Sequence, residues 1–322
     1  MSRLITALAF LLLLTSQAFG QEMEDLDFET ARPYMVTIGD SITSGLFANY
    51  NLDNPPSKFE VAYLAYLAAS GNLKHKEDRV HNGFKRFDLN WSTGTKADDV
   101  VFSHYERLKQ FIPDLETFDL AHSGDETWDL VPQSIALIEE IQKRNLEPVY
   151  VTVLMGANDL CAVHTKDVTT KSDFRKNVED GLSIILENTE ETKVLVSSIP
   201  NIFALQPNAN EKIWGISQTE FKVVSCQDMW ETFFPVCKTG TVNKNPRRWE
   251  QMQEQLRAYN KILEEKVEEM DQRYPGRIKF SPSVFETPIV REDLSFDCFH
   301  PSEHGHARLA DMTWEEGFWP DL

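Results

Sequence analysis

A serine near the start of the chain has the surroundings expected of a nucleophile. Ser41 follows the apolar run Tyr34 to Ile38 and stands in the sequence GDSITSG, residues 39–45. A serine placed after a strand can lie at the head of a helix, where backbone N–H groups favour developing negative charge. Gly-Asp-Ser is also typical of an ordinary turn or helix cap, so this motif alone does not indicate catalysis.

A base and a carboxylate that could orient it occur together near the other end of the chain. Asp297 stands three residues before His300, in a loop bounded by Pro301. A serine hydroxyl is too weakly acidic to attack an ester unaided. His300 would therefore accept the Ser41 proton and return it to the leaving alcohol, while Asp297 would fix the tautomer of the imidazole.

Two further segments offer hydrogen-bond donors for an oxyanion. Gly124, in the sequence HSGD, has a backbone N–H that no side chain obstructs, and Asn158, in GAND, has an amide NH₂. Together with the backbone N–H of Ser41, they would form an oxyanion hole for a tetrahedral intermediate. Each residue is common in turns, but the four roles together are not common, and they indicate acyl transfer.

The elements that must position these residues are short apolar runs that end in Gly, Ser, Asn or Pro and are separated by helical patterns. Such strands are apolar on both faces, which predicts an α/β fold with a parallel sheet covered on both sides. The predicted strands are 34–38, 118–121, 149–155, 193–199 and 277–281. The predicted helices are 59–70, 131–144, 172–187 and 248–274, and a further helix begins around Ser302.

Two stretches interrupt this alternation, residues 71–95 and 201–246. The second is rich in aromatic residues and follows a strand end, where open α/β sheets carry their ligand crevice. We interpret residues 201–246 as an insertion that forms either a lid or substrate wall, or a structural ornament. His304 and His306, on the helix that begins around Ser302, are interpreted as structural.

The composition narrows the classes of partner. The chain has 322 residues, with 51 acidic and 32 basic side chains and a net charge of −19. Negative charge repels phosphate backbones and anionic lipid, so nucleic acid is not expected as a partner. A small-molecule ester or lipid is expected, with at most transient contact to a lipid surface. No metal or organic cofactor is required by this chemistry.

The first residues have the order of a signal peptide. Arg3 is followed by an apolar run from Leu4 to Leu14 and by the small-residue ending Ala18-Phe19-Gly20. The run is too short to span a bilayer, and nothing later in the chain is long and apolar enough to do so. We therefore expect a signal peptide over 1–20, a single domain over 21–322, and a secreted or periplasmic protein.

Four cysteines, Cys161, Cys226, Cys237 and Cys298, follow the predicted signal peptide. In an oxidising compartment this even number indicates two disulfides, with three possible connectivities. Their spacing matches no metal-site pattern. Closure of a short loop favours a Cys226–Cys237 bond.

Taken in order, Ser41, Gly124, Asn158 and His300 resemble the four blocks of the GDSL or SGNH esterases, which are named for these residue types. Asp297 stands where that family places its carboxylate. The resemblance spans nearly the whole chain after residue 20. It implies a three-layer α/β/α, flavodoxin-like SGNH-hydrolase fold with a mostly parallel five-stranded sheet, and a serine hydrolase that acts on carboxylic esters.

The phospholipase B branch of this family is the most similar. Residues 90–94, NWSTG, resemble its Trp-Ser-x-Gly segment, and residues 156–161, GANDLC, resemble its Gly-x-x-Asp-Leu-Cys block. Residues 297–301, DCFHP, resemble its C-terminal block. In that resemblance two cysteines flank catalytic blocks that must meet, which implies a Cys161–Cys298 bond.

The second block, residues 121–124, AHSG, is only a loose match, and the chain is a single unit where mammalian members have repeats. The resemblance therefore implies an esterase and leaves the substrate open. A phospholipase or lysophospholipase-like lipase is the leading hypothesis. A short-chain carboxylesterase or carbohydrate deacetylase is the second, and a lipid- or glycan-binding module without activity is the third. Asn90 is a glycosylation acceptor only if the host secretes through an endoplasmic reticulum.

Overall fold

The five apolar runs form one parallel sheet. The computed structural model describes residues 32–321 except 61–62, 64–83, 97–99, 162–166, 217–220, 234–235 and 243–244. The strands are β1 (Tyr34–Gly39), β2 (Glu116–Asp119), β3 (Tyr150–Leu154), β4 (Lys193–Ser197) and β7 (Ile278–Ser281). Their order is β2-β1-β3-β4-β7, and each neighbouring pair is parallel. This is the strand order of flavodoxin-like folds, so the predicted fold class is confirmed.

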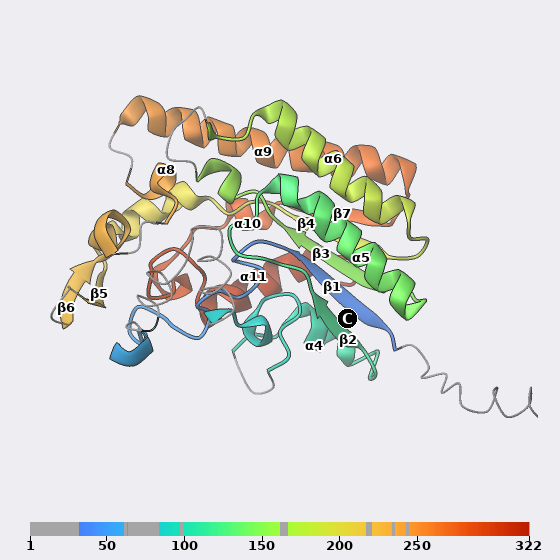
Figure 1. Ribbon diagram of the computed structural model, residues 1–322, viewed down its shortest axis with the longest axis horizontal. Coiled ribbons are helices and arrows are strands. Elements are labelled where there is room, and N and C mark those ends of the chain that lie inside the picture. The colour runs from blue at the N-terminus through green and yellow to red at the C-terminus, as the bar shows by residue number, and fades with distance from the viewer. Residues whose placement is uncertain are drawn as a thin grey trace, which may run out of the picture. The chain divides into compact units, whose positions relative to one another are not determined.

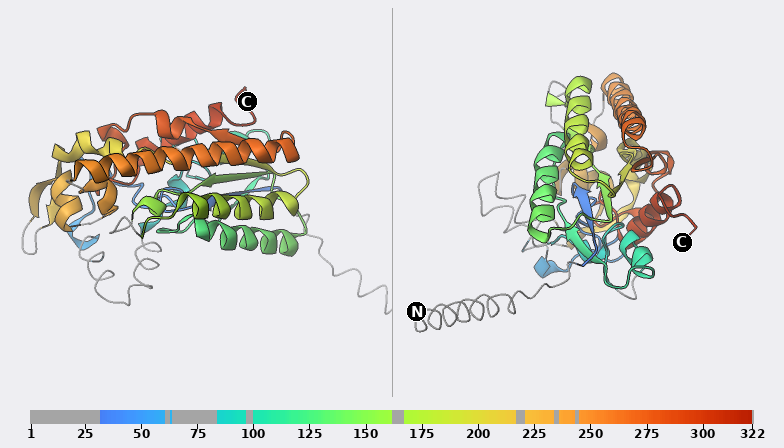
Figure 2. Two further views of the ribbon diagram at one scale, coloured as in Figure 1. Left: turned by 90° about the horizontal axis from the view of Figure 1, so that it is seen from above. Right: turned by 90° about the vertical axis from the view of Figure 1, so that its right-hand side faces the viewer.

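Helices cover both faces of this sheet and make a three-layer α/β/α arrangement (Figures 1 and 2). One face carries α5 (Leu130–Arg144), α6 (Lys171–Glu187) and α9 (Pro246–Arg273), and the other carries α4 (His104–Lys109) and α11 (Glu303–Glu315). Successive side chains of a strand point to opposite faces of the sheet, so alternate residues pack against the two helical layers. Val36 packs into the cluster that includes α5, α6 and α9, whereas Met35 packs with α4 and Trp314.

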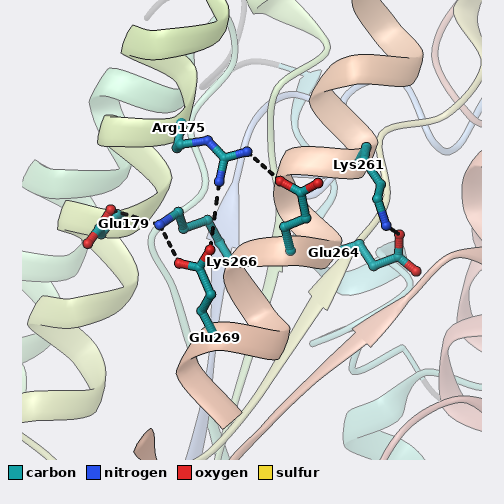
Figure 3. A network of polar contacts seen from close by, with 7 residues as sticks. Arg175, Glu179, Lys261, Glu264, Lys266 and Glu269 are labelled. Carbon is teal, nitrogen blue, oxygen red and sulfur yellow. Dashed lines mark hydrogen bonds and ion pairs between the residues drawn. The ribbon is translucent and has the colours of Figure 1, made fainter. Parts of the chain in front are cut away.

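The longest helix, α9, begins where the chain provides both a cap and a proline. The Asn245 side chain accepts hydrogen bonds from the backbone N–H groups of Arg247 and Arg248, and Pro246 occupies the first turn. Figure 3 shows the polar contacts that join α9 to α6. Lys266 is buried and lies 3.0 Å from Glu179 of α6 and 2.5 Å from Glu269 of its own helix. The Lys266–Glu179 pair joins the two helices, and the Lys266–Glu269 pair lies within α9.

The remaining described helices and strands are short. They are α7 (Cys226–Asp228), α8 (Lys238–Thr241), α10 (Ser283–Glu286), and the antiparallel hairpin of β5 (Lys212–Ile216) and β6 (Phe221–Ser225). The 3₁₀ turns are η1 (Phe87–Leu89), η2 (Thr127–Asp129), η3 (Asn158–Leu160), η5 (Ile202–Asn210) and η7 (Arg291–Asp293), and η6 (Met229–Phe233) is a π turn. The hairpin, α7 and α8 all lie in the insertion 201–246. The predicted helix 59–70 and the predicted signal peptide 1–20 fall largely or wholly outside the described residues.

The two disulfides differ from both predicted pairs. Cys161 is bonded to Cys237, and Cys226 is bonded to Cys298, with sequence separations of 76 and 72 residues. The predicted Cys226–Cys237 bond is wrong because the chain between these residues folds into the helical turns α7 and η6, and each sulfur meets a different strand-end loop. The predicted Cys161–Cys298 bond is wrong because these two loops are each attached to the insertion and not to one another.

The segment NWSTG is a buried structural turn. The Asn90 side chain is fully buried; its Oδ1 accepts from the backbone N–H groups of Ser92 and Thr93, and its amide donates to the Thr93 hydroxyl. The Ser92 hydroxyl lies 2.6 Å from that of Thr152 on β3. A side chain enclosed in this way cannot carry a glycan in the folded protein, so Asn90 is not a glycosylation site once the chain has folded.

Candidate active site

Ser41 lies immediately beyond the carboxyl end of β1, in a run of turns and not at the head of a regular helix. The sharp exit from the strand requires a glycine at position 39. A Cβ atom there would lie 2.4 Å from the backbone oxygen of Leu154 on the neighbouring strand. The turn is then closed by a hydrogen bond from the backbone N–H of Leu46 to the Ser41 carbonyl, at 3.0 Å. Ser41 is thereby held at the sheet edge, with 7% of its surface exposed.

The structure brings Ser41, His300 and Asp297 into one hydrogen-bonded chain, as predicted. His300 Nε2 lies 2.9 Å from Ser41 Oγ across 259 positions of sequence. His300 Nδ1 lies 2.5 Å from Asp297 Oδ2 on the opposite side of the ring. A neutral imidazole with its proton on Nδ1 donates to Asp297 and presents the Nε2 lone pair to the serine. The geometry is that of a nucleophile, a base and an orienting carboxylate.

The loop that carries Asp297 and His300 is braced by its own backbone. Asp297 Oδ1 accepts from the backbone N–H groups of Phe299 and His300, at 3.1 and 3.0 Å. Leu294 and Pro301 close the loop through an isolated β-bridge. Cys298 has φ +60°, a left-handed conformation that costs energy in a non-glycine residue. The disulfide to Cys226 attaches this residue to the insertion.

The two candidate oxyanion donors follow the strands on either side of β1. Gly124 comes after β2 and has φ +88°, a left-handed conformation that glycine adopts freely. Asn158 comes after β3, where its amide donates to the Asp125 carbonyl at 2.9 Å. Because Asp125 adjoins Gly124, this bond links the two loops. The sheet order β2-β1-β3 therefore assembles Gly124, Ser41 and Asn158 at one edge.

Sequence comparison agrees with this geometry. The model of the family described as GDSL-like lipase/acylhydrolase matches residues 35–312, which include all five of the predicted site residues. The chain belongs to this family. Membership places it among enzymes that hydrolyse esters.

Individual relatives of this GDSL chain are distant. It is 25% identical over 279 residues to the membrane-associated phospholipase B1 of Mus musculus. The match covers 74% of this chain and 18% of the mouse protein. The chain therefore spans less than a fifth of that relative's length. Solved structures with a similar chain trace include an α/β hydrolase from the metagenome of Lake Arreo, with 14% identity, TM-score 0.44, and coverage of 88% of this chain and 94% of the other. A variant of an acetyl xylan esterase from Geobacillus stearothermophilus has 15% identity, TM-score 0.42, and coverage of 89% and 96%.

Two residues that brace the loops of the candidate site, Gln133 and Asp159, were not predicted from the sequence. Gln133 of α5 exchanges two hydrogen bonds with the backbone of Gly39, both at 2.9 Å, and donates a third to Asp125 at 2.6 Å. Buried Asp159 accepts from the backbone N–H and the hydroxyl of Thr127, at 2.9 and 2.6 Å. Gln133 thus joins the Ser41 turn to the loop that carries Gly124 and Asp125. Its position in an amphipathic helix gives no local signal of that role.

Asp40, next to Ser41, is a buried carboxyl group with only one of its two oxygens hydrogen-bonded among the described residues. Its Oδ1 accepts from the backbone N–H of Ile42 at 2.9 Å, and its Oδ2 has no hydrogen-bond partner among the described residues. Burial raises the pKa of Asp40 to about 7, and the negative charges of Asp125 and Asp159 add to the effect. A substantial fraction of the carboxyl is therefore protonated near neutral pH.

The other two histidines of the C-terminal segment do not contact Ser41. His304 Nδ1 lies 3.0 Å from Asp293 Oδ1. His306 is fully buried, and burial lowers its pKa to about 3, so its ring is neutral. Among the residues that the structure describes, no group of three His, Cys, Asp or Glu side chains is arranged to hold a metal ion.

Proposed function

We propose that this chain is an exported serine esterase in which Ser41 forms an acyl-enzyme, His300 is the general base and acid, and Asp297 orients His300. The observation that carries the proposal is the chain of two hydrogen bonds from Ser41 Oγ through His300 to Asp297, at 2.9 and 2.5 Å. A surface Asp-His pair would be exposed, whereas here His300 is 4% exposed and Asp297 is 0% exposed. Burial of a fully paired proton relay supports a catalytic role.

The reaction would proceed in two halves. Ser41 Oγ attacks the ester carbonyl carbon while its proton passes to His300 Nε2, and the imidazolium is stabilised by Asp297. The oxyanion accepts hydrogen bonds from the backbone N–H groups of Ser41 and Gly124 and from the Asn158 amide. The tetrahedral intermediate collapses, and His300 returns the proton to the departing alcohol. Water, deprotonated by His300, then releases the acid and regenerates Ser41.

For the substrate we propose a phospholipid or lysophospholipid. The similarity to phospholipase B1 and the aromatic-rich insertion beside the site support this choice. The net charge of −19 opposes anionic lipid surfaces, so the headgroup would be zwitterionic. The same charge mildly favours the second candidate, a short-chain carboxylesterase or carbohydrate deacetylase, because its substrate does not lie in an anionic lipid surface.

Export is part of the proposal. Two disulfides are consistent with an oxidising compartment such as the periplasm or extracellular space. None of the described helices combines the length and the apolar character needed to cross a bilayer. The predicted signal peptide over residues 1–20 would direct the chain there.

The decisive experiment is active-site labelling with a fluorophosphonate probe. The folded chain should be labelled at Ser41, and Ser41→Ala should abolish both labelling and hydrolysis of p-nitrophenyl butyrate. Ser172→Ala, which removes an exposed serine in α6, is the control and should leave both intact. Absence of labelling at Ser41 in folded protein would reject the enzyme and favour a lipid- or glycan-binding module. Release of fatty acid from lysophosphatidylcholine separates the lipase from a deacetylase.

A further inference from the structure

An apolar pocket lies beside the catalytic loop and has no part in the proton relay. It is lined by side chains from several parts of the fold. These include Ile42 from the turn after β1, Leu205 from η5, Val284 from α10, Phe299 from the catalytic loop, and Leu309 and Met312 from α11. Most of its lining is hydrocarbon, as in other binding sites for apolar small molecules.

Three residues of the pocket wall adjoin the reacting residues in the sequence. Ile42 is the residue after Ser41, and Phe299 and Pro301 stand on either side of His300. The Phe299 ring meets the His300 ring edge to face, with centroids 5.1 Å apart. Phe299 therefore belongs both to the pocket wall and to the immediate surroundings of His300.

The charged side chains of the pocket wall are paired with each other. Among the described lining residues, Asp293 and Arg308 are the two that ionise, and they form an ion pair with each other. Arg308 also donates to the Pro288 carbonyl at 3.3 Å, and Asp293 also contacts His304. A free carboxylate or phosphate would have to compete with these contacts, whereas a hydrocarbon chain disturbs none of them. The lining therefore favours an uncharged, flexible ligand.

We propose that this pocket binds the acyl chain of the substrate and makes the enzyme selective for medium and long chains. The inference rests on the proposed Ser41 acyl-enzyme. Burial of each additional methylene should raise kcat/KM by about fourfold until the pocket is full. Ester hydrolysis should therefore increase steeply with chain length, and acetyl esters should be poor substrates. This preference distinguishes a lipase from a deacetylase.

The test uses a pocket-filling substitution on α11. Met312 is only partly buried, so Met312→Trp should fold while its indole occupies space at the pocket wall. Glu315→Trp, at an exposed position on the same helix, is the matched control. We would measure kcat/KM for p-nitrophenyl esters from acetate to palmitate with the wild type and both variants. A second filling variant, Val284→Phe, approaches the pocket from α10.

The expected result is a change in selectivity. Met312→Trp should lower kcat/KM for the dodecanoate ester by at least about tenfold, the equivalent of roughly two methylenes, and leave the acetate and butyrate esters within about twofold. Glu315→Trp should match the wild type throughout. Equal loss at every chain length in both filling variants, or no loss on dodecanoate, would overturn the pocket assignment while Ser41-dependent butyrate hydrolysis persists. No Ser41-dependent hydrolysis of any ester would instead refute the proposed function.

Discussion

Replacing Asp297 with asparagine tests the relay at its most constrained point. In the structure both carboxylate oxygens act as acceptors. Oδ2 faces His300 Nδ1 at 2.5 Å, and Oδ1 faces two backbone N–H groups at 3.1 and 3.0 Å. An amide has one acceptor oxygen and one donor NH₂, so asparagine cannot serve both sides.

Each orientation of the asparagine amide has a definite cost. If its oxygen stays with the two backbone N–H groups, its NH₂ faces His300 Nδ1. The ring proton then moves to Nε2, and His300 cannot accept the Ser41 proton. If the amide is reversed, the tautomer is kept, but two buried backbone donors lose their acceptor, at about 1–3 kcal/mol each. The first orientation is therefore favoured, and we expect kcat to fall by about 10⁴-fold with little change in KM.

The assay is steady-state hydrolysis of p-nitrophenyl butyrate, with thermal unfolding to verify that the variant is folded. His304→Gln is the matched control because it breaks a neighbouring His–Asp contact of 3.0 Å that does not involve Ser41. It should retain activity within about twofold. A folded Asp297→Asn enzyme that keeps more than about a tenth of the wild-type kcat would refute the assignment of Asp297 as the group that sets the tautomer.

Two further predictions concern the frame around the site. Removing either disulfide by double Cys→Ser substitution should cost a similar free energy of unfolding, about 4 kcal/mol, because the closed loops of 76 and 72 residues are nearly equal. Loss of the Cys226–Cys298 bond should also reduce kcat markedly, because Cys298 lies between Asp297 and His300. We would measure kcat and urea unfolding for both double variants. Equal kcat in the two variants would contradict this prediction. Asp40→Asn tests the buried carboxyl, whose pKa is raised from 3.8 to about 7 by burial. Because the folded state holds this proton more tightly, the contribution of Asp40 to wild-type stability is fully present below pH 4 and is lost as pH rises to about 7. The stability of the variant should therefore rise relative to that of the wild type by up to roughly 4 kcal/mol across that interval. A stability difference that does not change between pH 4 and 7 would show that Asp40 ionises normally.

Short sequence patterns predicted much of this site, because they reflect the conformation and burial of neighbouring residues. Apolar runs that end in turn residues located all five strands of the sheet, since strands covered on both faces are mostly apolar. Asp297 and His300 were paired correctly because three residues of one loop separate them. Ser41 could be linked to them only through the family resemblance and the chemistry that a hydroxyl requires.

The sequence by itself determined the residue types at the strand ends and their order along the chain. Tertiary structure alone decided what meets there. The partners of Cys226 and Cys298, the bridging role of Gln133 and the apolar pocket beside Phe299 all arise from contacts between distant segments. Periodicity and turn chemistry report the conformation and burial of a few neighbouring residues. The distance between two loops depends instead on strand order and on how the insertion packs, and no local pattern carries that information.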